Sequence, residues 1–370
     1  MIYNSKFENI QTQISRIEEE IRKTPYHKGT EHHIGKLRAR LSILKEKLLE
    51  YSQKKGAREG YAIKKQGDAT VILIGPPSVG KSTLLNKLTN AKSKVAPYAF
   101  TTVSVIPGMM NYKNANIQIL DVPGLIEGAE EGKGRGKEIL SVARGADLIL
   151  IIVDPEHISS IERIKHTLEK NGIRLNQKPP QVVIDKKTQG GIVIRSNIYQ
   201  TISKDYIKEI ALEFGIKNAE ITINENITLN RLIDAFSKNR VYIPSLIVIN
   251  KIDLLNDKNH TKICTDDSNH QSIIHISAEK SIGLDELKEK IWETLEFITV
   301  YLVRQDEEPS FYNPIVIKNG STLRDIANLL GTDFVENKRK AIIWGKHAKY
   351  PGQEVSLSTT AEDGLQVRFI

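Results

Sequence analysis

The sequence predicts an α/β fold whose main domain is a doubly wound parallel sheet. Short β-branched runs at residues 71–75, 115–120, 148–153 and 245–250 alternate with helical segments. Such an alternation is typical of a parallel sheet that helices cover on both faces. A helical pattern precedes these runs, and about seventy residues of short strands follow them. We therefore expect several domains arranged along the chain around one central sheet.

The amino-terminal region, residues 1–66, is predicted to be a helical hairpin. Its apolar residues recur at spacings of three and four on both sides of a turn-rich break at residues 24–35, which indicates two amphipathic helices. They are Ile10, Ile14, Ile17 and Ile21, then Ile34, Leu37, Leu41, Leu44 and Leu48. Residues 1–60 hold 13 Lys and Arg against 8 Glu, a net of +5 out of the chain's +8. This charge indicates either a solvated helix face or a nucleic-acid contact.

Three histidines, His27, His32 and His33, lie at the break between the two helices. We interpret them as an exposed polar tip and not as a metal site. The single cysteine, Cys264, excludes an internal disulfide and a cysteine-cluster metal site.

The alternation of strands and helices stops between about residues 172 and 240. Residues 178–195 indicate two strands around a basic Gly-Gly turn, and residues 206–214 indicate a helix. Because a buried strand resumes at residue 245, we expect an inserted small α/β subdomain. The predicted divisions are 67–170 and 242–297 for the two parts of the main domain, 171–241 for the insertion and 298–370 for a small α+β module.

Neither membrane insertion nor secretion is indicated by this sequence. The longest apolar run is residues 148–153, far short of the roughly 20 residues that a membrane helix needs. The first residues lack the apolar core of a secretory signal. We expect a cytoplasmic protein without membrane contact, and a monomer.

Residues 75–82 match the pattern GxxxxGK[ST], between a β-branched strand and a helix. Glycines let backbone amides approach phosphate oxygens, and the start of the helix adds the positive end of its dipole. We expect Lys81 to bind the β- and γ-phosphates and Ser82 to bind Mg²⁺. The predicted nucleotide-binding residues of this loop are Gly75, Pro76, Pro77, Ser78, Val79, Gly80, Lys81, Ser82 and Thr83.

A second motif selects the base. Asn250, Lys251 and Asp253 follow a buried strand, and the Asp253 carboxylate can accept both the N1 and N2 donors of guanine. Adenine offers no such pair of donors at that edge. Ser277 and Ala278 follow the strand at 272–276 and fit a backbone loop beside the guanine oxygen. The order and spacing of these motifs predict GTP and GDP as ligands.

Two further segments predict a sensor for the γ-phosphate. Asp121 ends a strand and is expected to hold Mg²⁺ through water, while the Gly124 amide can bond the γ-phosphate. Thr102 is expected to place its hydroxyl on the metal, and Thr101 is the competing choice. Loss of the γ-phosphate would release both segments. The predicted catalytic residues are Lys81, Thr102 and Gly124.

These residues resemble one family. The stretches GPPSVGKSTLLNKL, YAFTTVSVIPG, DVPGLIEGAEEGKGRG, GIRLNQKPP, NRVYIP and NKID are similar, in this order, to the developmentally regulated GTP-binding proteins, a branch of the Obg-related translation-factor GTPases. The likeness extends from HHIGKLRARL to AIIWGKHAKY and suits an archaeal-type member. It implies a GTPase domain with a ribosomal-protein-like insertion and a carboxyl-terminal TGS domain with a β-grasp fold.

The resemblance also implies partners. These are the ribosome or ribosomal RNA, through the basic helical and TGS regions, and a stabilising protein in some members. The leading hypothesis is a Mg²⁺-dependent GTPase that switches ribosome association. The alternative is a nucleotide-gated RNA- or ribosome-binding scaffold in which hydrolysis is incidental.

Leu125 stands where common signalling GTPases carry a glutamine, so its side chain cannot align the attacking water, and slow intrinsic hydrolysis is expected. Some relatives use a K⁺ ion held by an asparagine at the position of Ser78. K⁺ therefore stays one hypothesis for positioning the water. Backbone groups of the two sensor segments, or a group supplied by the ribosome, are the other.

Overall fold

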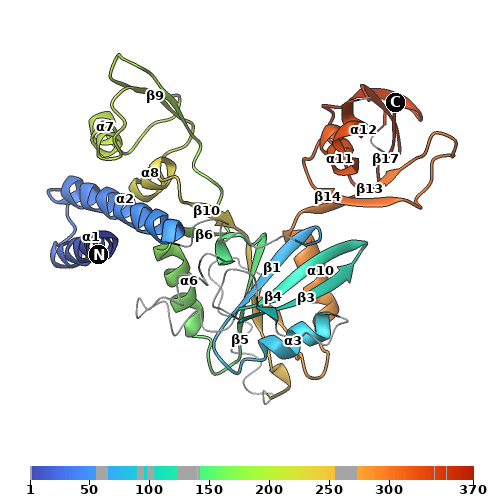
Figure 1. Cartoon of the computed structure of the whole chain (residues 1–370), viewed down its shortest axis with the longest axis horizontal. Coiled ribbons are helices and arrows are strands. Elements are labelled where there is room, and N and C mark those ends of the chain that lie inside the picture. The colour runs from blue at the N-terminus through green and yellow to red at the C-terminus, as the bar shows by residue number, and fades with distance from the viewer. Residues whose placement is uncertain are drawn as a thin grey trace. The chain divides into compact units, whose positions relative to one another are not determined.

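The computed structural model describes residues 2–55, 66–89, 96–97, 104–122, 140, 142–254, 273–336, 338–346 and 348–370. Their contacts divide the chain into two compact units (Figure 1). One unit combines residues 1–61 with 172–242, and the other combines 62–171 with 243–370. The amino-terminal region therefore shares a unit with the inserted segment, although the first half of the central domain separates them in sequence.

The central sheet lies in the second unit and, among the described residues, has the order β12-β11-β5-β1-β4-β3-β2. Five strands run parallel to one another: β1 (Ala69–Ile74), β4 (Ala115–Asp121), β5 (Leu148–Val153), β11 (Ser245–Ile249) and β12 (Ile273–His275). They include the apolar runs that the sequence analysis singled out. The predicted parallel sheet is confirmed.

The other edge of this sheet is antiparallel, which the sequence analysis did not anticipate. Strand β3 (Ser104–Tyr112) pairs with β4, and the short β2 (Ala96–Pro97) pairs with β3. Lys113 and Asn114 join β3 to β4, both with positive φ (45° and 66°), as a two-residue hairpin turn requires. Pro107 and Gly108 inside β3 weaken the strand signal in the sequence.

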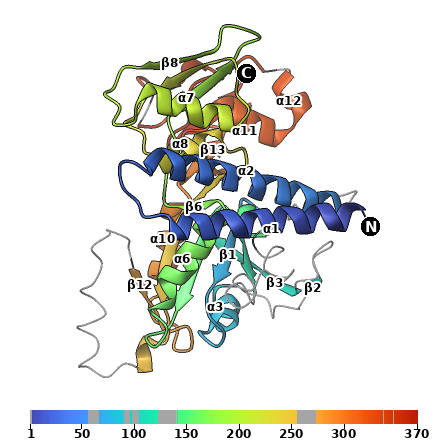
Figure 2. The same cartoon turned by 90° about the vertical axis from the view of Figure 1, so that its left-hand side faces the viewer.

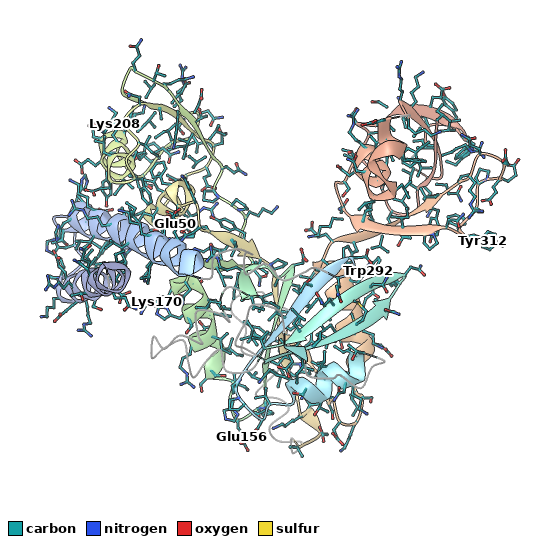
Figure 3. All side chains as sticks on the ribbon, in the orientation of Figure 1. Glu50, Glu156, Lys170, Lys208, Trp292 and Tyr312 are labelled. Atoms are coloured by element: carbon teal, nitrogen blue, oxygen red, sulfur yellow. The ribbon has the colours of Figure 1, made fainter. Side chains whose placement is uncertain are left out.

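Helices cover the central sheet. On one face, α3 (Lys81–Leu88) and α10 (Leu284–Thr294) contribute buried residues to one apolar cluster with alternate residues of β1, such as Val71 and Leu73. Trp292 of α10, labelled in Figure 3, packs edge-on against Tyr112 and Phe297. Helix α6 (Ser160–Lys170) packs against β5.

Residues 298–370 form a mixed sheet with α11 (Leu323–Leu330) packed against it, as expected for a β-grasp fold. Its order among the described residues is β14-β13-β17-β15-β16. Thr322 and Asp325 form a reciprocal capping box that begins α11. The remaining elements are β13 (Phe297–Leu302), β14 (Pro314–Lys318), α12 (Thr332–Glu336), β15 (Lys340–Trp344), β16 (Gln353–Ser356) and β17 (Gln366–Phe369).

The first unit begins with the predicted helical hairpin. Helices α1 (Ile2–Lys23) and α2 (Glu31–Lys55) lie side by side in both views (Figures 1 and 2). The three histidines at the hairpin turn have separate polar contacts: His27 with the Gly29 amide, His33 with Glu20 and His32 with Glu209. No group of three or more potential metal ligands occurs within the described ranges.

The inserted segment contains a small sheet covered by α7 (Lys204–Glu213) and α8 (Leu229–Phe236). Both predicted strands, β7 (Val182–Lys186) and β8 (Ile192–Ser196), are present, but they do not pair with each other. Strand β9 (Ala219–Ile223) lies between them, antiparallel to β7 and parallel to β8. The Gly-Gly turn is therefore a crossover and not a hairpin. Strands β6 (Ile173–Leu175) and β10 (Val241–Ile243) pair separately.

A second face of α2 packs against α7 and α8. This face is made of small residues at helical spacing, Gly35, Ala39 and Ser42, all of them buried. A Cβ at Gly35 would lie 1.7 Å from the Tyr206 hydroxyl oxygen, so only glycine allows this approach. The Tyr206 hydroxyl donates to the Glu31 carbonyl at 2.9 Å. The hairpin is thus part of the insertion's core, and not only a self-packed stalk.

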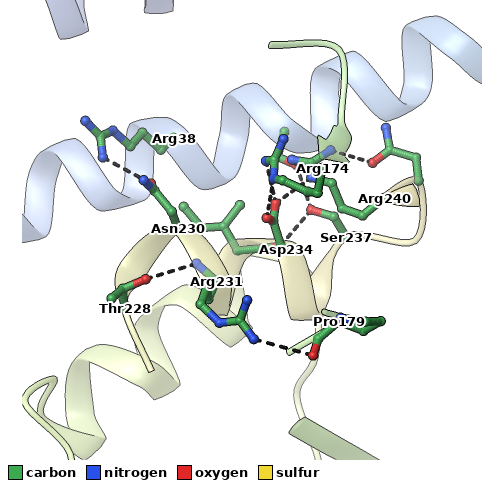
Figure 4. Close-up of polar contacts among 12 residues, drawn as sticks. Arg38, Arg174, Pro179, Thr228, Asn230, Arg231, Asp234, Ser237 and Arg240 are labelled. Carbon is green, nitrogen blue, oxygen red and sulfur yellow. Dashed lines mark hydrogen bonds and ion pairs between the residues drawn. The ribbon is translucent and has the colours of Figure 1, made fainter. Parts of the chain in front are cut away.

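A buried carboxylate joins the elements of this unit (Figure 4). Both oxygens of Asp234 in α8 accept from Arg174, at 2.6 and 2.8 Å, and one of them also accepts from Arg240 at 2.5 Å. Arg240 in turn donates to the hydroxyl of Ser42 in α2 at 2.9 Å. Strand β6, helix α8 and helix α2 are therefore linked through one charged network.

Candidate nucleotide-binding site

The predicted phosphate loop connects β1 to α3. Gly75 follows β1, and a Cβ there would lie 2.0 Å from the Ile152 carbonyl oxygen of the adjacent strand. Ser78 and Gly80 have φ of 63° and 91°, which bends the chain before α3 begins at Lys81. Pro76 and Val79 are buried, whereas Pro77, Ser78 and Ser82 are exposed. Thr83 lies in the first turn of α3.

Lys81 is held across this loop. Its side chain is only 8% exposed, and its ammonium donates to the carbonyls of Gly75 at 3.0 Å and of Pro76 at 2.7 Å. The start of α3 lies at the same place, so a fixed ammonium and a helix amino terminus share the mouth of the loop. Both features favour an anionic ligand such as a phosphate chain.

Ser82 and Asp121 meet at the carboxyl edge of the sheet. Parallel pairing of β1 with β4 sets Asp121 opposite Leu73, and the Ser82 hydroxyl donates to Asp121 Oδ2 at 2.6 Å. Asp121 is 3% exposed, and its Oδ1 has no hydrogen-bond partner within the part of the chain that the structure describes. A hydroxyl and a carboxylate with an open acceptor position are hard oxygen ligands, and they fit Mg²⁺.

Asn250 connects the three loops of the site. It is 2% exposed, its amide donates to the Val79 carbonyl at 2.9 Å, and its side-chain oxygen accepts from the Ala278 amide at 2.9 Å. A Cβ at Gly80 would lie 2.4 Å from Asn250 Nδ2, so the phosphate loop and the base-side loop are in close contact. The motifs, which are separate in the sequence, therefore lie next to one another in the structure.

Asp253 is prepared to accept hydrogen bonds. Its pKa is lowered, chiefly because the Ser277 hydroxyl bonds its carboxylate and also because Lys280 lies 3.7 Å away. The carboxylate is therefore ionised at neutral pH, the form that accepts two donors from guanine. Its side chain remains 13% exposed.

One residue of this edge was missed by sequence reasoning. Asp154 directly follows β5, and its carboxylate accepts from the ammonium of Lys251 at 3.0 Å and from the ring of His157 at 2.5 Å. The signal available in the sequence was an aspartate directly after a fully apolar strand, much as Asp121 is the last residue of β4.

Four residues of interest, Thr101, Thr102, Gly124 and Leu125, lie outside the described residues. Their expected roles stay predictions. Within the described ranges, no helix is both long and apolar enough to cross a membrane.

Profiles of known domain families match most of the chain. The family described as 50S ribosome-binding GTPase matches residues 70–186. Its described carboxyl-terminal region matches 189–297, and the TGS domain matches 298–370.

Relatives in archaea and eukaryotes match nearly the whole chain. A GTP-binding protein of Methanocaldococcus jannaschii is 49% identical over 361 residues, which are 96% of this chain and 91% of the relative. Developmentally-regulated GTP-binding protein 2 of Homo sapiens is 37% identical over 360 residues, 96% of this chain and 98% of that protein. Its Dictyostelium discoideum homologue is 39% identical over the same shares of both chains. This chain therefore belongs to the developmentally regulated GTP-binding proteins, a family of GTPases with a TGS domain.

Proposed function

We propose that this GTPase is Mg²⁺-dependent and acts as a switch in its association with the ribosome or ribosomal RNA. In the reaction, the oxygen of a water molecule bonds to the γ-phosphorus, and the bond from that phosphorus to the β–γ bridging oxygen breaks, giving GDP and phosphate. The observation that carries the proposal is the pair of Ser82 and Asp121, held 2.6 Å apart beside the phosphate loop with one carboxylate oxygen open.

Each residue of the site has a proposed role. Lys81 binds the β- and γ-phosphates, and Ser82 with Asp121 holds the metal site, with Thr102 as a third oxygen and Thr101 as its alternative. Bound Mg²⁺ would neutralise charge that develops on the phosphate oxygens. Gly124 bonds the γ-phosphate through its amide, while Asp253 and the loop at Ser277 and Ala278 recognise guanine.

The attacking water needs a positioning group other than Leu125, which has no hydrogen-bonding side chain. A K⁺ ion near Ser78 is one proposal, and backbone or ribosomal groups are the other. Turnover measured in K⁺ and in Na⁺ at equal ionic strength separates them. Equal rates would exclude K⁺ as the group that positions the water.

The hairpin tip supports an RNA contact better than the helix sides do. Lys36 and Arg40 pair with Glu209 and Glu213 at 3.1 and 2.9 Å, so their charges are balanced within the unit. Arg22, Tyr26 and Lys28 are exposed near the turn, and they combine positive charge with an aromatic ring on which a base can stack. Binding through these residues should weaken steeply with salt.

The deciding experiment is steady-state GTP hydrolysis with and without purified ribosomes, in K⁺ buffer with Mg²⁺ or with EDTA. We expect turnover only with Mg²⁺ and a many-fold increase with ribosomes. Lys81→Ala is the control that should abolish turnover under every condition. Unchanged turnover with EDTA would refute the proposed metal dependence, and unchanged turnover with ribosomes would refute the ribosome-stimulated switch.

Leu125 favours a second candidate, a nucleotide-gated scaffold whose hydrolysis is incidental. Release from the ribosome distinguishes the two functions. In a switch, a non-hydrolysable GTP analogue should keep the protein bound after GTP-loaded protein has dissociated. In a scaffold, the two release rates should be equal.

A further inference from the structure

The carboxylate of Asp154 is fully engaged beside the base-side loop. Its Oδ2 accepts from Lys251 Nζ at 3.0 Å, and its Oδ1 accepts from the His157 ring at 2.5 Å and from the His157 amide at 3.1 Å. Strands β5 and β11 pair in parallel with Val153 opposite Ile249, and this register brings Asp154 next to Lys251. The pairing of the two strands therefore determines this contact.

The Asp154 carboxylate is buried, which by itself disfavours its ionised form. The Asp154 side chain is 7% exposed, and burial on its own raises the pKa of a carboxyl group. Hydrogen bonds and charge from His157 and Lys251 outweigh burial, so the pKa of Asp154 is lowered and the group stays ionised. A buried ionised carboxylate is retained only where its partners compensate for lost solvation.

Lys251 is restrained at both ends. Its backbone has φ of 62°, a left-handed conformation that is strained for a non-glycine residue and persists only where the surrounding structure holds it. Its neighbour Asn250 is tied to the phosphate loop and to Ala278, and its own ammonium is tied to Asp154. The methylene stem between these two fixed points is therefore held in one position, two residues before Asp253.

We propose that Asp154, aligned by His157, is a positioning residue for guanine binding that fixes Lys251 so that its stem lies against the base. This inference rests on the proposed nucleotide site and extends it to a residue without direct contact to the ligand. In an unrestrained lysine, binding would have to order the side chain first, which costs affinity.

A purely structural role is the competing explanation. Asp154 also accepts the His157 amide, so it closes the turn that leads into α6. Removing such a turn closure would lower stability regardless of what stands at position 251. The two roles therefore differ in whether the effect of Asp154 on nucleotide binding depends on the Lys251 ammonium.

The test measures dissociation of a fluorescent GDP analogue from the full-length protein in a double-mutant cycle. Asp154→Asn should speed dissociation about 10- to 100-fold, the range expected for loss of a charge-assisted hydrogen bond. In a Lys251→Met background, which keeps the stem but not the charge, Asp154→Asn should add no further increase. A second increase of the same size in that background would overturn the proposal.

His157 supplies a rescue test. His157→Ala should speed GDP dissociation by a smaller factor, and His157→Gln, which retains a side-chain donor, should restore most of the lost residence time. If alanine and glutamine behave alike, the alignment by His157 is wrong.

The wild-type protein and Lys81→Ala separate this inference from the proposed function. If wild type does not retain GDP, or if Lys81→Ala retains it equally well, the proposed site fails. If those two behave as expected but Asp154→Asn dissociates at the wild-type rate, the inference alone fails.

Discussion

Asp121 in the candidate nucleotide site and Asp234 in the first unit, which combines the hairpin with the insertion, are both almost completely buried, with 3% and 6% of their surface exposed. Asp234 has both oxygens occupied by the guanidinium groups of Arg174 and Arg240. Asp121 receives one hydroxyl, and its second oxygen has no partner among the described residues. Burial is thus the same at the two places, but only Asp121 keeps capacity for a ligand.

This difference separates a structural carboxylate from a functional one. A buried acceptor without a partner costs about 1–3 kcal/mol, so its retention indicates that something else completes it. A saturated carboxylate gains nothing from a ligand and serves to hold its neighbours. The comparison predicts opposite consequences when each aspartate is changed.

The largest effect on stability is expected at Asp234. Asp234→Ala leaves Arg174 and Arg240 without their shared acceptor, and breaking a buried ion pair in this way costs about 3–5 kcal/mol. The measurement is hydrogen exchange of backbone amides in α2 and α8, which should lose protection together. GTP turnover should persist at temperatures where the central sheet stays folded. Unchanged protection in both helices would contradict the structural role.

At Asp121 the effect on activity should be large and the effect on stability absent or favourable. Asp121→Asn keeps the shape but removes the charge, and loss of one electrostatic group at a reacting phosphate costs about 10²- to 10³-fold in turnover. The midpoint temperature of thermal unfolding should not fall, because the substitution removes a buried charge that lacks a full set of hydrogen-bond partners. Lower stability together with normal turnover would reverse our assignment of the two aspartates.

Much of the candidate nucleotide site could be predicted from the sequence. Each of the two motifs, residues 75–82 and residues 250–253, is one short segment of the chain. Their chemistry requires particular residue types at fixed spacing. The parallel strands before each motif then determine that the loops meet at one edge of the sheet. Geometry added the contacts between loops, such as those of Asn250 with Val79 and Ala278.

The hairpin–insertion interface could not be predicted in the same way. Periodicity marks the large apolar residues of α2, but it gives no weight to Gly35, Ala39 and Ser42. Small residues become informative only when the partner surface is known, and that surface begins more than 160 residues later with Tyr206. Asp154 was missed for the same reason, because its importance depends on Lys251, which follows a strand almost one hundred residues later in the sequence.

The next largest effect on stability is expected from a substitution at Gly35, where α2 packs closely against Tyr206. Gly35→Ala would normally favour a helix by about 1 kcal/mol, but here the new Cβ meets the Tyr206 hydroxyl oxygen at 1.7 Å. Overpacking of this kind costs about 1–3 kcal/mol, so we expect net destabilisation of the first unit in hydrogen exchange. The penalty should shrink in a Tyr206→Phe background. A stabilising Gly35→Ala would show that α2 does not pack there.

The smallest effect should come from a saturated carboxylate that is less buried. Glu225 accepts from Arg231 at 2.7 and 2.8 Å, but its side chain is 20% exposed. Glu225→Gln should therefore cost only about 1 kcal/mol, less than Asp234→Ala, as measured by hydrogen exchange in α8. Glu50→Gln, the same chemical change at an exposed position of α2, should have no effect.

The pH dependence of this effect follows from the direction of the shift. The hydrogen bond from Arg231 lowers the pKa of Glu225 below its ordinary value of 4.5 in the folded protein. The stabilisation is then complete above pH 4.5 and is lost as the pH falls through the lowered pKa. Wild type and Glu225→Gln should differ at neutral pH and converge in acid. A difference that persists below the lowered pKa would indicate shape and not charge, and the contrast with Asp234 would then reflect packing alone.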